Sequence, residues 1–142
     1  MKFDHIGLVT NDIREGRDFL SSAFGVCSWS KEFNDPGIRV TVQFGISESG
    51  PCFELISPLG VESPVSAALK SGKNILNHIA YLVDDLDDAA LNMRAHGCLP
   101  VSEAQPAVAY NRSRVQFFIS PLKFMIELIE APHHEHDYGE IL

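Results

Sequence analysis

Apolar and polar residues alternate at the start of the chain and then recur at a longer interval. The run KFDHIGLVT (2–10) alternates and is rich in residues that favour strands. The run DIREGRDFLSSAFG (12–25) places apolar residues near helical spacing and stops at Gly25, a common residue at helix ends. This pattern predicts a strand followed by a helix.

Three short β-rich runs follow the first helix. They are VCSWSKEF (26–33), IRVTVQFGI (38–46) and CFELISP (52–58). The segments between them, NDPG (34–37) and SESGP (47–51), carry residues typical of turns. The first half of the chain is therefore predicted to have the order β-α-β-β-β.

The second half repeats this order after a short connecting helix. Its predicted elements are a strand in NHIAYLV (77–83), a helix in LDDAALNMRAHG (86–97), and strands around CLPVSE (98–103), RVQFFIS (114–120) and KFMIELIE (123–130). The connecting helix is expected in SPVSAALKSG, with Ser63 as N-cap, Pro64 as first helical residue and Gly72 as C-cap. We expect a single domain over 1–142, made of module one (1–60), a linker helix segment (61–74), module two (75–131) and a tail (132–142).

The two halves also match at polar positions. FDHIGLVTND aligns with LNHIAYLVDD, which pairs His5 with His78. CFELISP aligns with MIELIEAP, which pairs Glu54 with Glu127. The offset along the chain is identical for the two pairs, so each half carries one histidine and one glutamate at the same spacing, as a duplicated fold would.

These four residues are predicted to share one metal ion. Glu54 and Glu127 lie in apolar strands, where an ionised carboxylate needs a cationic partner, and the four strand segments carry lysine only at their edges. A single histidine on a strand is more often structural, but matched spacing can bring equivalent residues of both halves to one point. Two imidazoles and two carboxylates suit one divalent ion, Ni²⁺, Co²⁺ or Zn²⁺, with Mn²⁺ or Fe²⁺ as alternatives.

Composition and charge reduce the classes of molecule that the protein is expected to bind. The net charge of −8 at pH 7 disfavours nucleic acid, and no apolar run approaches the roughly 20 residues of a membrane span. The three cysteines form no C-x-x-C pair, so we expect them to be reduced. The N-terminal residues lack the pattern of a secretory signal, which predicts a cytoplasmic protein with a small-molecule partner.

The motifs DHIGLVTNDI, FELISPLGVESPV, NHIAYLVDDL and MIELIEAP resemble those of the vicinal oxygen chelate superfamily, which includes glyoxalase I, methylmalonyl-CoA epimerase, extradiol dioxygenases and bleomycin-resistance proteins. The resemblance covers residues 2 to about 131 and is greatest to small bacterial glyoxalase I-like and methylmalonyl-CoA epimerase-like proteins. It implies an α+β fold in which paired βαβββ modules form an incomplete β-barrel around a metal site. It also implies that His5, Glu54, His78 and Glu127 are the metal ligands and that the protein is a homodimer.

The resemblance further implies proton transfer at a carbon next to a carbonyl or thioester group, with Glu127 as the base and Glu54 returning the proton. The leading hypothesis is a glyoxalase I-type lyase (lactoylglutathione lyase type). It would isomerise the hemithioacetal of a 2-oxoaldehyde, such as methylglyoxal, and a thiol, such as glutathione, through an enediolate. The alternatives are an epimerase of a 2-substituted acyl-CoA and a non-catalytic small-molecule binding or resistance protein. The segment ISPLKF replaces a longer hairpin of methylmalonyl-CoA epimerases, which weighs against the epimerase hypothesis.

Two further groups are candidates for ligand contacts. Arg112 and Arg114 could bind a glutathione carboxylate or a CoA phosphate, although a solvated strand edge explains them equally well. The tail carries His133, His134 and His136, which could bind a transition metal but more commonly belong to a mobile terminus. The sequence leaves both questions open.

Overall fold

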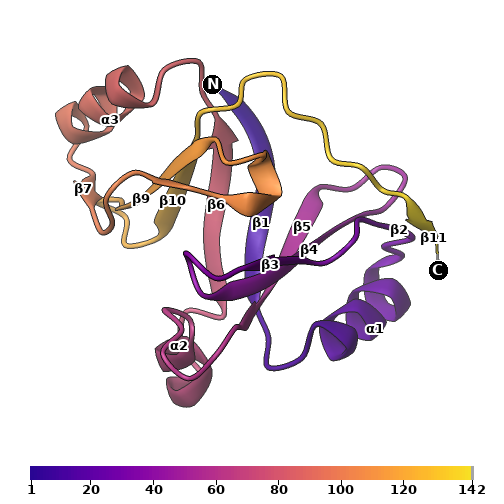
Figure 1. The fold of residues 1–142 in the computed structure, drawn as a ribbon. Coiled ribbons are helices and arrows are strands. Elements are labelled where there is room, and N and C mark those ends of the chain that lie inside the picture. The colour runs from indigo at the N-terminus through magenta and orange to yellow at the C-terminus, as the bar shows by residue number, and fades with distance from the viewer. Residues whose placement is uncertain (142) are drawn as a thin grey trace.

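One β-sheet runs through the whole molecule (Figure 1). The structure is a computed structural model, and it describes residues 1–141. Module one contributes β1 (Lys2–Val9), α1 (Ile13–Phe24), β2 (Ser28–Trp29), β3 (Phe33–Asp35), β4 (Val40–Ile46) and β5 (Cys52–Pro58). Module two contributes β6 (Leu76–Leu82), α3 (Leu86–Ala95), β7 (Leu99–Pro100), β8 (Gln105–Pro106), the 3-10 helix η1 (Val108–Tyr110), β9 (Arg114–Ile119) and β10 (Met125–Ile129). The connecting helix is α2 (Ser66–Ser71), and the tail ends in β11 (Glu140–Ile141).

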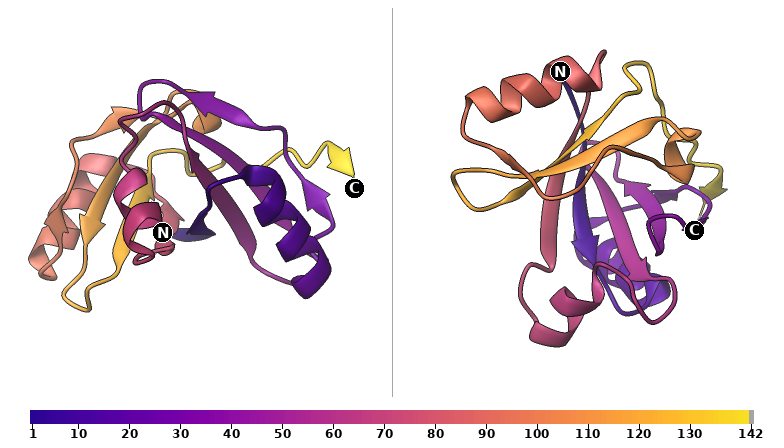
Figure 2. Two further views of the ribbon diagram at one scale, coloured as in Figure 1. Left: turned by 90° about the horizontal axis from the view of Figure 1, so that it is seen from below. Right: turned by 60° about the vertical axis from the view of Figure 1, so that its left-hand side comes forward.

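The two modules join edge to edge at their first strands. The strand order is β11-β2-β4-β5-β1-β6-β10-β9-β7, with β3 paired to β4 and β8 to β9. β1 pairs antiparallel with β6, and each of these strands pairs in parallel with the last strand of its own module, β5 or β10. Figure 2 shows the sheet bent into an open arch. The predicted fold of paired βαβββ modules is confirmed, and β5, β1, β6 and β10 form the centre of the sheet.

The register of β1 against β6 reveals a pseudo-twofold axis. Ile6 lies opposite Ile79, its own counterpart in module two, while His5 lies opposite Ala80 and Gly7 opposite His78. Directly opposed residues in a sheet point to the same face, as do residues two apart on one strand. The two histidines therefore share one face and lie diagonally across the axis.

The helices α1 and α3 pack against separate halves of the sheet, on the flanks of the molecule (Figure 1). The buried cluster beside α1 consists of Ile13, Leu20, Val26, Trp29 and Leu55, and the cluster beside α3 of Val83, Leu86, Cys98, Phe118 and Leu128. Cys52 and Ile56, which share a strand face with Glu54, belong to a third cluster with Phe44 and Tyr110. No helix in residues 1–141 combines the length and hydrophobicity of a membrane span.

The connecting helix is shorter than the sequence predicts. It begins at Ser66, because Ser63 forms a turn in which its Oγ accepts a hydrogen bond from the Val65 N–H (3.4 Å). The Ser63 carbonyl also accepts one from the Ser66 N–H (3.2 Å), so the prediction that Pro64 starts the helix is wrong. Gly72 is the C-cap as predicted, with a φ of 70° that a glycine adopts without strain.

Candidate metal centre

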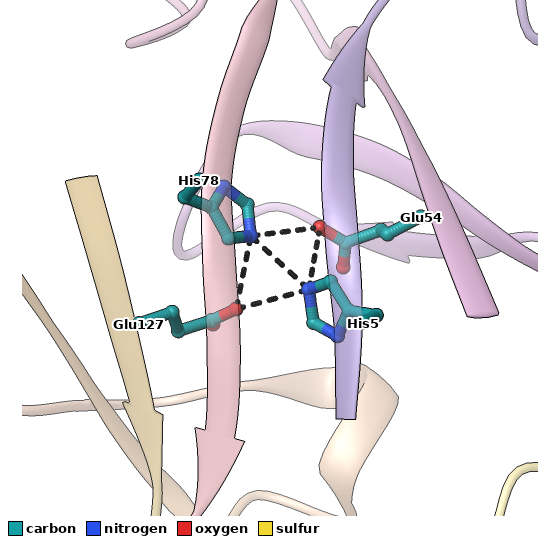
Figure 3. Close-up of side chains that lie close together, drawn as sticks. All are labelled: His5, Glu54, His78 and Glu127. Carbon is teal, nitrogen blue, oxygen red and sulfur yellow. Dashed lines mark hydrogen bonds and ion pairs between the residues drawn. The ribbon is translucent and has the colours of Figure 1, made fainter. Parts of the chain in front are cut away.

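The four predicted ligands meet at one point in the middle of the sheet. His5, Glu54, His78 and Glu127 come from β1, β5, β6 and β10, and all four are buried. Figure 3 shows their side chains converging. The two Nε2 atoms are 3.1 Å apart, and each lies 3.2–3.5 Å from Oε1 of both glutamates. The four residues come from one chain, so the modules complete the site without a second subunit.

The geometry fits a first-row divalent ion. For metal–ligand bonds of about 2.1 Å, neighbouring ligand atoms are about 3.0 Å apart in an octahedron and about 3.4 Å apart in a tetrahedron. The observed separations of 3.1–3.5 Å agree with this interval to within about 0.1 Å. Oε1 of Glu127 is also buried near both imidazole nitrogens but makes no hydrogen bond of regular geometry. A cation bonded to that oxygen would remove this defect.

Without a cation, protons on the imidazoles compensate the buried carboxylates. Burial alone would lower the pKa of His5, but the charge of Glu54, the hydrogen bond to Asp4 and close contacts with Glu127 and Glu54 raise it well above its ordinary value. The pKa of His78 is also raised: burial would lower it, but close contacts with both glutamates outweigh that effect. Burial alone would raise the pKa of Glu54, yet the facing histidines lower it to about 2. The buried glutamates therefore favour a positive charge beside them, which either protonated imidazoles or a bound cation can supply.

These pKa shifts predict how a bound ion stabilises the protein at different pH. A histidine whose folded pKa is raised stabilises the fold below about pH 6.5, and that stabilisation is lost as the pH rises through the raised value. A metal ion must displace those protons. We expect the gain in Tm on adding metal, measured by calorimetry, to increase as the pH is raised above about 6.5. A gain that is constant or falls over this range would contradict the assignment.

Each histidine is oriented by the residue that precedes it. Nδ1 of His5 lies 2.8 Å from Oδ2 of Asp4, and Nδ1 of His78 lies 2.9 Å from Oδ1 of Asn77. Asp4 and Asn77 are themselves equivalent in the duplication, because each directly precedes the matched histidine of its module. Such partners fix the tautomer that presents Nε2 to a metal. The sequence analysis did not predict this pair of orienting residues. The signal was present, because a polar residue precedes the matched histidine in both halves: Asp4 before His5 and Asn77 before His78.

Gly7 leaves room for the ring of His78 on the neighbouring strand. A Cβ at residue 7 would lie 2.2 Å from Cε1 and 2.5 Å from Nδ1 of His78, well inside contact distance. Phe117 also packs edge-on against the ring, with centroids 5.3 Å apart. The His78 ring therefore cannot shift freely if a side chain is added at residue 7.

We expect Gly7→Ala to displace His78 and to weaken metal binding on the order of 10-fold or more, measured by competition with a chelator. Ala80→Gly is the matched control, because Ala80 faces His5 at the equivalent position and the change removes a Cβ. It should cost about 0.5–1 kcal/mol of stability and leave metal affinity nearly unchanged. Equal affinity in wild type and Gly7→Ala would show that the contact is unimportant.

A cavity of about 250 Å³ opens beside the four residues. Glu54, His78 and Glu127 line it, whereas His5 is fully buried behind them. Much of the remaining wall is apolar, including Val42, Ile56, Phe117 and Met125, and none of the described residues lining it is lysine or arginine. The site therefore faces a small, mainly apolar chamber.

Asp35 is a third carboxylate at the cavity wall, but its oxygens are already engaged. Oδ1 accepts hydrogen bonds from the N–H groups of Gly37 and Ile38, both at 3.1 Å. Oδ2 accepts one from the Val108 N–H at 2.9 Å, which ties β3 to η1. Asp35 thus stabilises the cavity wall, and Glu54 and Glu127 are the carboxylates available for chemistry.

The structure does not place the two predicted arginines in this cavity. Arg114 forms a bidentate pair with Glu130 (3.1 and 2.9 Å) and contacts Asp87 at 3.3 Å. Arg112 lies in a turn with a φ of 65° and is exposed. Binding of the anionic end of a substrate by these arginines stays a prediction.

The tail crosses from module two back to module one (Figure 1). Of its histidines, His133 is exposed, while the rings of His134 and His136 pack against Tyr110. β11 then pairs with β2. The tail is therefore part of the folded structure, contrary to the expectation of a mobile terminus.

Comparison with known proteins identifies the family. The sequence model of the glyoxalase/bleomycin resistance protein/dioxygenase superfamily matches residues 4–132 of this chain. The chain therefore belongs to this superfamily. The uncharacterized protein YqjC of Bacillus subtilis (strain 168) is 28% identical over 142 residues, which cover 98% of this chain and 99% of YqjC.

Solved structures share the fold. A hypothetical protein from Bacillus halodurans C-125 superposes with a TM-score of 0.79 at 21% identity, covering 96% of this chain and 98% of that one. The methylmalonyl-CoA epimerase from Mycobacterium tuberculosis superposes with a TM-score of 0.74 at 22% identity, covering 90% and 86%. At these identities the likeness concerns the fold alone.

Proposed function

We propose that the protein is a metal-dependent isomerase of the glyoxalase I type. It would convert the hemithioacetal of a 2-oxoaldehyde and a thiol, such as glutathione, into a 2-hydroxyacyl thioester. The observation that carries this proposal is the buried set of two imidazoles and two carboxylates at the wall of a cavity. When bound there, a divalent ion supplies a Lewis acid that makes a carbon next to a carbonyl group more acidic.

Glu127 is the proposed base, and Glu54 is proposed to return the proton to the adjacent carbon. The two carboxylates occupy equivalent positions across the pseudo-twofold axis and both line the cavity. Each has two oxygens, so one can hold the ion while the other exchanges a proton with substrate. His5 and His78 would hold the ion as neutral imidazoles, which add no negative charge to the site.

The charge of the site favours a neutral reacting group. Two glutamates balance the charge of a divalent ion, and none of the described residues lining the cavity is lysine or arginine. A second carboxylate next to the reacting carbon, as in a malonyl group, would be desolvated without a counter-ion. A hemithioacetal carries no charge at its reacting carbons, and the apolar wall suits a small alkyl substituent.

A 2-substituted acyl-CoA epimerase is the second candidate. Epimerisation needs a base on each face of the carbon, and the symmetric placement of Glu54 and Glu127 meets that need. Methylmalonyl-CoA epimerases are also among the proteins of similar fold. The predicted homodimer and cytoplasmic location are compatible with either candidate and stay predictions.

Two assays in D₂O separate the candidates. Protein loaded with Ni²⁺, Co²⁺ or Zn²⁺ is incubated with methylglyoxal plus glutathione, or with one epimer of methylmalonyl-CoA. We expect thioester formation in the first mixture and no deuterium incorporation in the second. Deuterium uptake and loss of stereochemistry in the second mixture alone would establish the epimerase. Inactivity in both, at full metal loading, would favour a non-catalytic binding protein.

A further inference from the structure

The tail places a histidine directly behind the metal centre. The ring of His136 stacks on Phe44, with centroids 4.1 Å apart and planes 30° from parallel, and its side chain is only 8% exposed. Its Nε2 lies 2.9 Å from Oδ2 of Asp4. Further along, the Tyr138 hydroxyl donates to Sγ of Cys52 at 3.2 Å. His136 is therefore held in a part of the tail that is anchored to module one.

Oδ2 of Asp4 collects three donors at one point. They are Nδ1 of His5 at 2.8 Å, the Tyr110 hydroxyl at 2.6 Å and Nε2 of His136 at 2.9 Å. An ionised carboxylate only accepts hydrogen bonds, so both ring nitrogens must carry hydrogen. With hydrogen on Nδ1, the neutral ring of His5 presents the lone pair of Nε2 to the site.

The two halves of the site differ in this respect. Among the described residues, Nδ1 of His78 has Asn77, a neutral amide, as its hydrogen-bond partner, while Asp4 beside His5 is fixed by residues from η1 and the tail. His5 is also the ligand that does not line the cavity. For His5 to swing away from an ion, the hydrogen bond to Asp4 must break, and Asp4 is held by Tyr110 and His136.

We propose that the tail is a working part of the metal centre, in which His136 acts as a positioning residue that holds Asp4, and through it His5, and thereby retains the ion. His136 does not bind the ion itself. The inference rests on the metal site of the proposed function, but not on which substrate is used. It assigns the tail a role that the duplicated modules alone do not supply.

The test uses full-length protein loaded with Co²⁺, and it measures affinity and release by chelator competition. We expect His136→Ala to weaken Co²⁺ binding about 10- to 100-fold and to shift the absorption spectrum of bound Co²⁺. His136→Gln should recover most of the affinity, because the amide nitrogen can donate to Asp4 from a similar position. The control is His133→Ala, which alters an exposed tail histidine and should leave the affinity unchanged.

Five outcomes overturn the inference. His136→Ala could release Co²⁺ as slowly as wild type, or His133→Ala could cause the same loss. His136→Gln could fail to restore affinity although it melts like wild type without metal. Wild type could also bind two ions per chain, one of them lost in His136→Ala, which would make His136 a ligand. If wild type binds no ion, the proposed function fails with the inference; if it binds one tightly but turns over no substrate, only the function fails.

Discussion

Glu127→Gln is expected to lower kcat/KM for the hemithioacetal by about 10³-fold, because the amide cannot accept a proton from carbon. The substitution keeps the shape of the side chain and an oxygen that can bind a metal ion. Metal content, measured on the same sample, should therefore fall much less than activity. The combination of retained metal and lost turnover would identify Glu127 as a base as well as a ligand.

Glu54→Gln is the matched comparison, since Glu54 holds the equivalent position in module one. Loss of similar size in both variants would mean that both carboxylates transfer protons. A Glu127→Gln variant that keeps more than about a tenth of wild-type activity at full metal loading would contradict the assigned role.

Removing one histidine ligand is expected to have an equally large effect through a different cause. His78→Ala leaves three candidate ligands, two of which are facing carboxylates, so we expect the protein to lose its stoichiometric ion during purification. Activity should fall about 10³-fold or more, because several kcal/mol of transition-state stabilisation by the ion is lost. Metal content and activity should decline together here, unlike in Glu127→Gln.

His96→Ala provides a control on the surface. His96 is an exposed histidine at the end of α3 whose Nδ1 contacts the Asn92 carbonyl at 2.8 Å, and it lies outside the candidate site. This variant should retain metal and activity. Full metal retention by His78→Ala would contradict its assignment as a ligand.

The clustering of the four candidate ligands could be predicted because a duplication turns a weak pattern into a geometric constraint. A histidine or glutamate on a strand says little alone, but equal spacing in two halves requires equivalent places in two similar modules. The fold then brings those places together, since β1 and β6 pair about Ile6 and Ile79. The sequence therefore predicted which four residues meet in one buried cluster that could hold a metal ion, and their roles as ligands stay a prediction.

The parts that sequence did not predict depend on contacts between distant segments. The tail meets Asp4 through His136, across 132 positions, and no local pattern encodes that contact. The start of α2 depends on the hydrogen bonds of Ser63. Its hydroxyl and carbonyl groups form a local turn, and this turn takes the place of the helix cap that the sequence predicts. The fit of His78 over Gly7 is visible only once β6 lies beside β1.

The most direct test of the central claim is anomalous diffraction from crystals of the metal-loaded protein, recorded at the absorption edge of the ion. We predict one peak per chain, within about 2.1 Å of both Nε2 atoms and of an oxygen from each glutamate. A peak only at the tail histidines, or no peak near His5, Glu54, His78 and Glu127 in protein that binds the ion in solution, would contradict the account.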